Sequence, residues 1–175
     1  FKNKSFKPVT GKLNASWPTN AKFSKEKPYG FLFDGKNTLS LNKLNKAELP
    51  LEAFTLEAWV KITDPGKDCA VISTLNEDRK DLGGWQLGFT RSSFSFSMTT
   101  LNKKKRPTIN SINSREKAIY LQNDVWYHLC ATYNGKEMKL YVDAQLAASD
   151  EVSGKIVYPK NLFGLIGAQD NNKKY

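Results

Sequence analysis

The chain has 175 residues, with 27 Lys and Arg against 17 Asp and Glu, a formal net charge of +10 and an isoelectric point near 9.5. A chain of this length forms one domain that buries roughly 70% of its unfolded surface, so it needs no disulfide framework to fold. It has neither a run of 18 apolar residues nor an apolar leader, which argues against a membrane span and predicts a mature piece or fragment of a longer protein.

The positive charge favours acidic partners such as sulfated or uronic polysaccharides, nucleic acid and anionic surfaces, although a lysine-rich proteome would give the same balance. Sequence-independent binding to nucleic acid needs basic residues on one continuous surface, with aromatic rings between them. The lysines here are divided between the first 27 residues and several loops. We therefore expect no nucleic acid partner.

Residues 1–27 are rich in Lys, Asn and Ser and show no periodicity. This composition predicts a lysine-rich lead-in, loosely attached to a domain that covers residues 28–175. Within that domain short apolar runs alternate with turn residues, and no amphipathic helix of ordinary length is found. The runs lie at 31–41, 54–62, 70–75, 84–89, 93–98, 126–148 and 161–168. The pattern predicts an all-β fold, an antiparallel two-sheet β-sandwich.

Alternation in the predicted strands separates a core face from a second, more polar face. In 54–61 the polar face contains Trp59 beside Glu57, whereas in 84–89 Trp85 shares a face with Leu87 and Phe89. We therefore expect Trp85 to lie in the core and Trp59 to be exposed.

If these strands share a sheet, their second faces form a shallow groove of polar side chains around one aromatic ring. Such a surface suits a sugar, whose hydroxyl groups need donors and acceptors and whose C–H face stacks on a ring. The predicted carbohydrate-binding residues are Trp59, Glu57, Gln86 and His128. The structural alternative is that Trp59 lies under a crossing loop and that His128, the one histidine of the chain, is a satisfied structural residue.

The longest interval without a strand pattern is 99–124, which exceeds what a hairpin needs and predicts a functional or disordered loop. Its basic stretch consists of Lys103, Lys104, Lys105 and Arg106. Such a charge run is either a solvated loop or a contact for an acidic ligand.

The segment 126–148 predicts a hairpin, because Asn134-Gly135 readily takes the positive φ of a tight turn. Cys69 and Cys130 lie in predicted strands; they either pair, if those strands are neighbours, or act as two small buried hydrophobes. With one histidine there is no multi-histidine metal site, and motifs for a serine nucleophile or a phosphate loop are absent.

The segments FTLEAWVK, WYHLCATYNGKEMKLYVDAQLAA and LFGLIGA together resemble the laminin-G-like branch of the concanavalin A-like lectin and glucanase jelly-roll superfamily, over Phe31 to about Ala168. The resemblance implies two curved antiparallel sheets packed face to face, with a concave face that meets glycans in many relatives. It also raises calcium as a cofactor. Oxygen ligands for that ion are offered by Asp34, Asn37, Asp170 and Asn171.

The sequence departs from the family pattern in three places. Asp143-Ala144 replaces the usual Asp-Gly turn, so a left-handed Ala144 would cost roughly 1 kcal/mol or more, or the turn differs. The family's strand after the Ile-Gly motif has no counterpart before Tyr175, which predicts truncation or another segment in its place. The E-x-D-x-x-E strand of the family's glycosidases is absent.

The leading hypothesis is a non-catalytic, lectin-like carbohydrate-binding module of a larger secreted or surface protein, with a neutral or acidic glycan and other domains of the parent protein as partners. The alternative is a protein-interaction or adhesion module that uses rims and basic loops. A third hypothesis is a glycosidase or polysaccharide lyase. Glycoside hydrolysis needs two carboxylates, and alternation places only Glu57 on the face; Tyr141 and His128 keep the lyase open.

Overall fold

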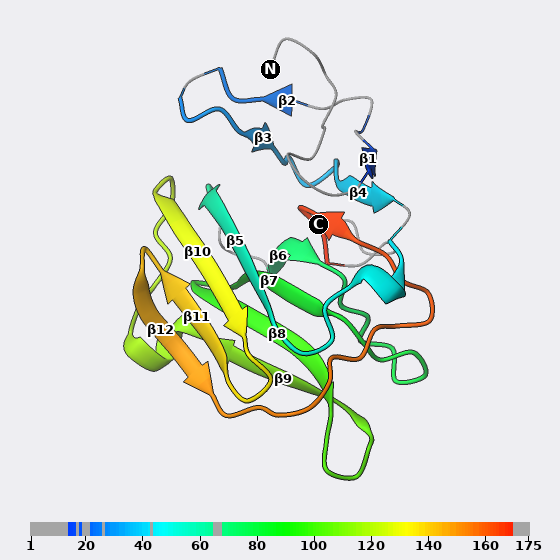
Figure 1. Ribbon diagram of the computed structural model, residues 1–175. Coiled ribbons are helices and arrows are strands. Elements are labelled where there is room, and N and C mark those ends of the chain that lie inside the picture. Colours follow the sequence, from blue (N-terminus) through cyan, green and yellow to red (C-terminus); the bar gives the residue numbers. More distant parts are fainter. Residues whose placement is uncertain are drawn as a thin grey trace.

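The computed structural model describes residues 14–16, 18, 22–25, 27–42, 44–64 and 68–169. Their strands form two packed sheets and one short hairpin (Figure 1), and every strand pair is antiparallel. This architecture confirms the predicted all-β two-sheet sandwich. Of the helices in the described part of the chain, none has the length and apolar character needed to cross a membrane.

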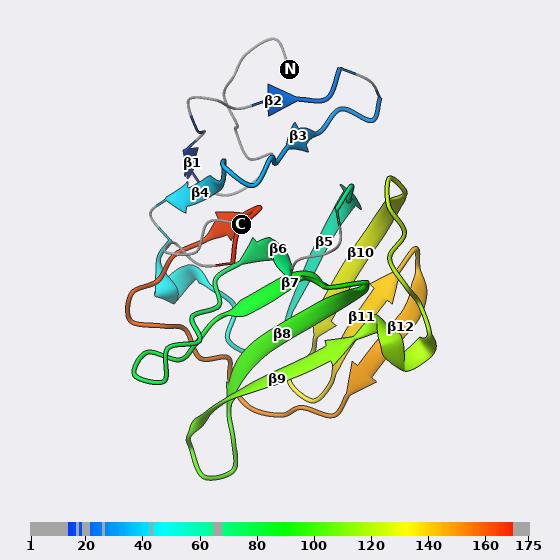
Figure 2. The same cartoon turned by 180° about the vertical axis from the view of Figure 1, so that it is seen from behind.

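The wider sheet has seven strands in the order β1, β4, β13, β6, β7, β8, β9 and faces the viewer in Figure 2. Their bounds are β1 Asn14–Ser16, β4 Leu39–Asn42, β13 Leu165–Ile166, β6 Cys69–Ser73, β7 Trp85–Thr90, β8 Ser93–Leu101 and β9 Pro107–Asn113.

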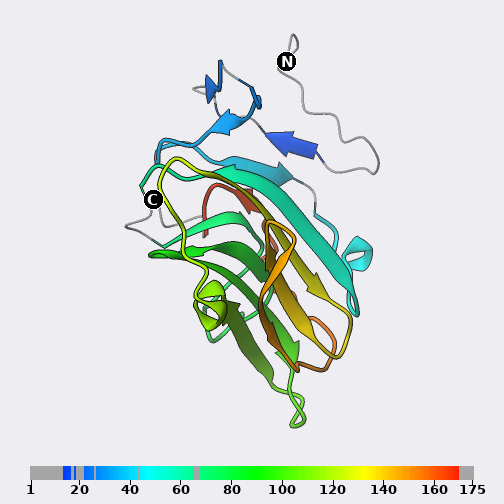
Figure 3. The same ribbon diagram turned by 90° about the vertical axis from the view of Figure 1, so that its left-hand side faces the viewer.

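The narrower sheet has four strands in the order β12, β11, β10, β5 and lies across the wider one as a second layer (Figure 3). Its strands are β12 Gln145–Asp150, β11 Met138–Val142, β10 Trp126–Tyr133 and β5 Phe54–Lys61. The remaining elements are β2 Lys22–Phe23 paired with β3 Phe31–Leu32, and two 3-10 helices, η1 Lys46–Glu48 and η2 Ser114–Lys117.

The core lies between the sheets because alternate side chains of β8 and β10 point inward. Phe94, Phe96 and Met98 of β8 have no exposed surface, and neither has Leu129 of β10. Phe94 packs against Tyr127 across the two layers, with ring centroids 4.9 Å apart in an edge-on arrangement. A face-to-face sandwich held by interdigitating apolar side chains follows directly from this period of two.

The prediction of one long loop over 99–124 is wrong. β8 continues to Leu101, and the chain turns at once into β9 and then into η2. The strand escaped detection because Asn110 interrupts the alternation around the buried Ile112; its amide donates to the Thr100 hydroxyl (3.0 Å) instead of contacting apolar atoms.

The segment predicted as a loosely attached lead-in contributes strands. β1 pairs with β4 at the margin of the seven-stranded sheet, and β2 pairs with β3. These strands were missed in the sequence because their segments contain few apolar residues. A three-residue strand at the sheet margin needs few buried side chains. The boundary between residues 27 and 28 stays a prediction.

The two cysteines are free thiols in different sheets. Cys69 belongs to β6 and packs against the core, whereas Cys130 lies on the outward face of β10. Burial raises the pKa of both thiols, and at Cys130 the carboxylate of Glu57 raises it further. The sequence left open whether Cys69 and Cys130 form a disulfide, and in the structure they do not.

The turn between β11 and β12 keeps the hairpin geometry without glycine. Asp143 and Ala144 both have positive φ, 49° and 64°. Asp143 gains a compensating hydrogen bond, because its carboxylate accepts the His128 N–H at 2.8 Å. Ala144 has no polar side chain that could do the same, so it carries the steric cost of the left-handed region.

Replacing Ala144 with glycine should therefore raise the free energy of unfolding by about 0.5–1 kcal/mol, since the gain in native backbone energy exceeds the entropy that glycine adds to the unfolded chain. Chemical denaturation of both proteins measures the change. Ala148→Gly, in a buried strand position of β12, is the matched control and should destabilise. Destabilisation by Ala144→Gly would contradict the assignment of strain to this turn.

Candidate functional site

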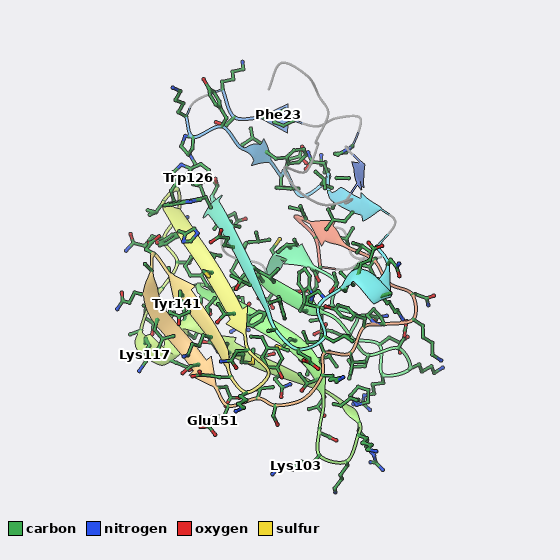
Figure 4. The ribbon with its side chains drawn as sticks, viewed as in Figure 1. Phe23, Lys103, Lys117, Trp126, Tyr141 and Glu151 are labelled. Atoms are coloured by element: carbon green, nitrogen blue, oxygen red, sulfur yellow. The ribbon has the colours of Figure 1, made fainter. Side chains whose placement is uncertain are left out.

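In the four-stranded sheet, alternate residues of each strand point away from the core, and most of them are polar. β5 is exposed at every second residue, and β10 and β11 are half-buried at theirs. This outer face consists of Thr55, Glu57, Trp59 and Lys61 from β5, Trp126, His128, Cys130 and Thr132 from β10, Lys139 and Tyr141 from β11, and Leu146 and Ser149 from β12. Figure 4 shows Trp126 and Tyr141 on it, at the end of β10 and on the neighbouring β11.

Trp59 dominates the outer face. Its side chain is 66% exposed, the largest exposure of any bulky hydrophobic residue in the described part of the chain. It lies directly opposite His128 in the register of β5 and β10, and the two rings are 5.1 Å apart at 41°. The expectation that Trp59 is exposed while Trp85 is buried, at 6% exposure, is confirmed.

Glu57 and His128 form a polar pair next to this ring. The His128 Nε2 atom lies 3.5 Å from the Glu57 Oε2 atom, so the imidazole is held between the carboxylate and the indole. Glu57 is otherwise exposed, and it faces Cys130 across the strand pair. The arrangement offers an acceptor, a ring nitrogen and a flat apolar surface within one small area.

The backbone fixes His128 from the other side. Its N–H donates to the Asp143 carboxylate, and its C=O accepts the Asp143 N–H, both at 2.8 Å. Asp143 thus ties the β11–β12 turn to β10 and uses its carboxylate for a structural bond. Glycoside hydrolysis needs two carboxylates that flank one bond, and within the described strands of this sheet Glu57 is the one carboxylate on the outer face.

The end of the outer face near Lys61 contains a second aromatic ring. Trp126 lies opposite Lys61, whose ammonium group is 5.9 Å from the indole centroid. The ring is half-buried, and its outermost carbon comes near Gly30 of the segment between β2 and β3. Trp126 therefore closes one end of the face and is less available to a ligand than Trp59.

Gln86 does not belong to this face, and that part of the predicted site is wrong. It lies on β7 in the seven-stranded sheet, where its side-chain oxygen accepts a hydrogen bond from the Ser73 hydroxyl at 3.4 Å. Alternation places a residue on an inner or outer face but does not reveal which sheet its strand joins. The structure brings together Trp59, Glu57 and His128 and puts Gln86 on the opposite side of the sandwich.

Tyr141 is the neighbour that the sequence-based site omitted. It lies opposite Cys130 on β11, on the same outward face. The alternation of 138–142 already separates Lys139 and Tyr141 from the buried Met138 and Leu140, so this signal was present in the sequence. Its hydroxyl adds a donor and acceptor beside the predicted residues.

The basic stretch Lys103, Lys104, Lys105 and Arg106 forms the exposed tip of the β8–β9 hairpin, and Lys103 is labelled there in Figure 4. Asn102 orders this tip. Its side-chain oxygen accepts the N–H groups of Lys104 and Arg106, at 2.9 and 3.0 Å, while Lys105 takes a positive φ of 57°. Four cations are thus held on a compact turn rather than on a long loop.

The candidate calcium ligands are partly outside the described residues. Asp170 and Asn171 lie there, so that part of the calcium site stays a prediction. The Asp34 carboxylate accepts the Lys36 N–H at 3.0 Å, which is the main reason that its pKa is lowered. Asn37 is buried and donates to the Leu32 carbonyl at 3.4 Å. Among the residues described, no group of three or more His, Cys, Asp and Glu side chains has the arrangement of a metal site.

Comparison with known proteins agrees with this architecture. Mouse pappalysin-1 is 37% identical over 128 residues, and human pappalysin-1 is 36% identical over 124; both matches cover 64% of this chain. The chain spans only 7% of the length of either relative.

Solved structures with the same fold are much more distant in sequence. The binding domain of Paraclostridial Mosquitocidal Protein 1 superposes with a TM-score of 0.67 at 14% identity, covering 93% of this chain and 41% of that one. The ligand binding domain of botulinum neurotoxin serotype D, in complex with N-acetylneuraminic acid, gives a TM-score of 0.67 at 17% identity, covering 93% and 39%.

A family model matches residues 24–175, which includes both sheets from β3 onward. The match agrees with the sandwich topology and with the motifs in β5, in the β10–β11 hairpin and around β13. The chain belongs to the laminin-G-like family of the concanavalin A-like lectin/glucanases superfamily.

Proposed function

We propose that this domain is a non-catalytic carbohydrate-binding module and that the outer face of the four-stranded sheet contacts the sugar. The observation that carries the proposal is the 66% exposed indole of Trp59, held beside His128 and Glu57 in the middle of a strand pair. A large exposed ring has no role in the core, and a flat apolar surface next to polar groups matches the two kinds of surface on a pyranose ring.

The roles follow from the chemistry of each group. The Trp59 indole stacks against the C–H face of the sugar, Glu57 accepts hydrogen bonds from hydroxyl groups, and His128 donates or accepts beside it. Tyr141 extends the polar surface toward β11. Because the site is a sheet surface rather than a deep cavity, it suits one or two residues of an accessible chain end or side branch.

An acidic glycan is the preferred class. The net charge of +10 and the four cations at the β8–β9 tip favour a negatively charged ligand. The complex of a fold relative with N-acetylneuraminic acid supports an acidic sugar, although that likeness concerns the fold. We infer that the module works outside the cell as part of a larger secreted or surface protein, beside other domains.

The first test is a screen of the purified domain against neutral, sialylated, uronic and sulfated glycans, with and without calcium. The best ligand is then titrated against variants. Trp59→Ala should weaken binding by about tenfold or more, because loss of a central aromatic contact costs about 2 kcal/mol. Tyr120→Ala removes a different exposed ring, 54% exposed, and should leave the affinity unchanged.

Equal affinity of Trp59→Ala and the parent protein would contradict the assignment of the site. The non-catalytic assignment has its own check, since incubation with each polysaccharide should release no sugar. Turnover that disappears in Glu57→Gln would make the domain an enzyme.

The alternative function, a protein-interaction module, is favoured by a different observation. The Asn102-ordered tip is compact and projects away from the sandwich (Figure 1), as an interaction loop does. If the glycan screen finds no ligand, this tip is the first surface to test against acidic protein partners.

A further inference from the structure

The outward side chains of β5 form a row whose charge changes along the strand. Glu57, Trp59 and Lys61 point to the same side, two residues apart, and all three are exposed. Successive outward positions of a strand are roughly 7 Å apart, so a carboxylate and an ammonium group flank the Trp59 indole at comparable distances. The proposed sugar platform therefore has a negative end and a positive end.

Lys61 keeps its charge available for a ligand. Its ammonium group lies 5.9 Å from the centroid of the Trp126 ring and makes no ion pair with a carboxylate of the described residues. Asp124, two residues before β10, instead accepts a hydrogen bond from the Thr63 hydroxyl at 3.0 Å. Trp126 is half-buried, with its outer carbon near Gly30, so the ring supports the flexible lysine side chain without neutralising it.

The other lysine of the outer face is already paired. The ammonium group of Lys139, on β11, lies 2.8 Å from the Glu137 carboxylate. The hydrogen bond with Glu137 raises the pKa of Lys139, because it favours the charged form of the amine. An anionic ligand would have to displace Glu137 from Lys139, whereas Lys61 is available without such an exchange.

Glu57 restricts which anions fit on this face. It lies two residues from Trp59 on the side away from Lys61, and its contact with His128 at 3.5 Å is an ion pair only when that imidazole is protonated. A sugar that stacks on Trp59 and carries one negative group is attracted when that group lies over Lys61 and repelled when it lies over Glu57. A densely sulfated chain would place further anions beside Glu57, so the face favours a sugar with a single charge.

We propose that this face binds a pyranose with one carboxylate, a uronic or sialic acid residue, in one orientation. The ring stacks on Trp59, the carboxylate lies over Lys61, and hydroxyl groups point to Glu57. The inference rests on the proposed function and adds Lys61 as the residue that determines specificity, with Trp126 as a positioning residue that supports its ammonium group. The basic β8–β9 tip lies elsewhere, since Figure 4 shows Trp126 and Lys103 at opposite ends of the molecule.

Matched sugars test the proposal. The probes are the methyl glycosides of glucuronic acid and of N-acetylneuraminic acid, each compared with its uncharged methyl ester. Binding is measured by NMR titration at neutral pH and low salt. We expect the better-bound acid to bind roughly fivefold more tightly than its ester, which is the effect of one exposed charge pair. This preference should shrink at high salt, because salt screens exposed charges.

Variants of single cations identify the group that contacts the carboxylate. Lys61→Gln should reduce the affinity for the acid to that for its ester and leave the affinity for the ester unchanged, whereas Lys61→Arg should retain the preference. Lys139→Gln removes the same charge from the paired lysine and should leave the ratio of the two affinities unchanged. The double variant Lys104→Gln and Lys105→Gln tests the β8–β9 tip and should also leave this ratio unchanged.

The outcomes separate this inference from the proposed function. If Trp59→Ala weakens binding of acid and ester alike while Lys61→Gln keeps the parent ratio of affinities, the inference is overturned and the sugar-binding face stands. If none of these sugars binds, both proposals are overturned. Loss of the acid preference in the tip variant, or binding of a heparin tetrasaccharide to the parent protein that Lys61→Gln weakens more than it weakens binding of either acid, would also overturn the inference.

Discussion

Replacing Trp85 with alanine should lower the free energy of unfolding by roughly 3–5 kcal/mol, as truncation of a core aromatic does. The indole is 6% exposed and packs against Phe54 of the other sheet. Its Nε1–H donates to the Tyr158 hydroxyl at 3.2 Å, and that hydroxyl donates to the Pro50 carbonyl at 2.8 Å. Burial raises the pKa of Tyr158 to about 12, so this hydroxyl stays protonated and able to donate.

Trp59→Ala is the matched control for that experiment. It removes the same side chain from a site that is 66% exposed, so the loss in free energy of unfolding should stay below about 1 kcal/mol. Urea denaturation of the two variants gives both values. If Trp59→Ala destabilised the domain as much as Trp85→Ala does, the exposed ring would be structural and the proposed sugar contact would lose its main residue.

Gly84→Ala should cost roughly 2–5 kcal/mol, from left-handed backbone strain together with overpacking. Gly84 has a φ of 96°, and a Cβ atom there would overlap the backbone carbonyl oxygen of Thr74. The same residue donates its N–H to the Val157 carbonyl and accepts the Thr99 N–H, at 2.7 and 2.9 Å. Three segments therefore meet at one glycine and cannot separate to admit a methyl group without losing hydrogen bonds.

Gly30→Ala is the corresponding control. Its nearest contact would be the Trp126 ring at 3.7 Å, an ordinary van der Waals distance. The change should stay within about 0.5 kcal/mol. Thermal melts of both variants, with circular dichroism to verify the fold, provide the comparison. A Gly84→Ala melt equal to that of the parent protein would contradict the close approach to Thr74.

Sequence patterns predicted the fold, and three of the four residues predicted for the carbohydrate site lie together on one face. The physical reason differs for each part. The period of two in β5 and β10 is strong because one face of each strand is buried, so the shared face of Trp59, Glu57 and His128 could be predicted. Gln86 was misplaced because its strand has the same alternation but joins the other sheet, and sheet membership depends on long-range pairing.

The missed elements have weak local signals. β9 carries Asn110 on its inner side, and β1 has only three residues, so neither offers the apolar repeat on which prediction depends. The Asp143-Ala144 turn is the opposite case. The register of the flanking strands determines its left-handed conformation even though the sequence lacks the usual glycine.

The position of β13 has a consequence for how the chain acquires its structure. This two-residue strand lies between β4 and β6, and among the described residues β4 pairs with β1 and β13 alone. Residues 165–166 thus join 39–42 to the rest of the sheet, across more than 120 positions of sequence. During synthesis β1 and β4 can join the rest of the wide sheet only after Leu165 and Ile166 have left the ribosome. We therefore expect this side of the domain to form slowly and late in folding.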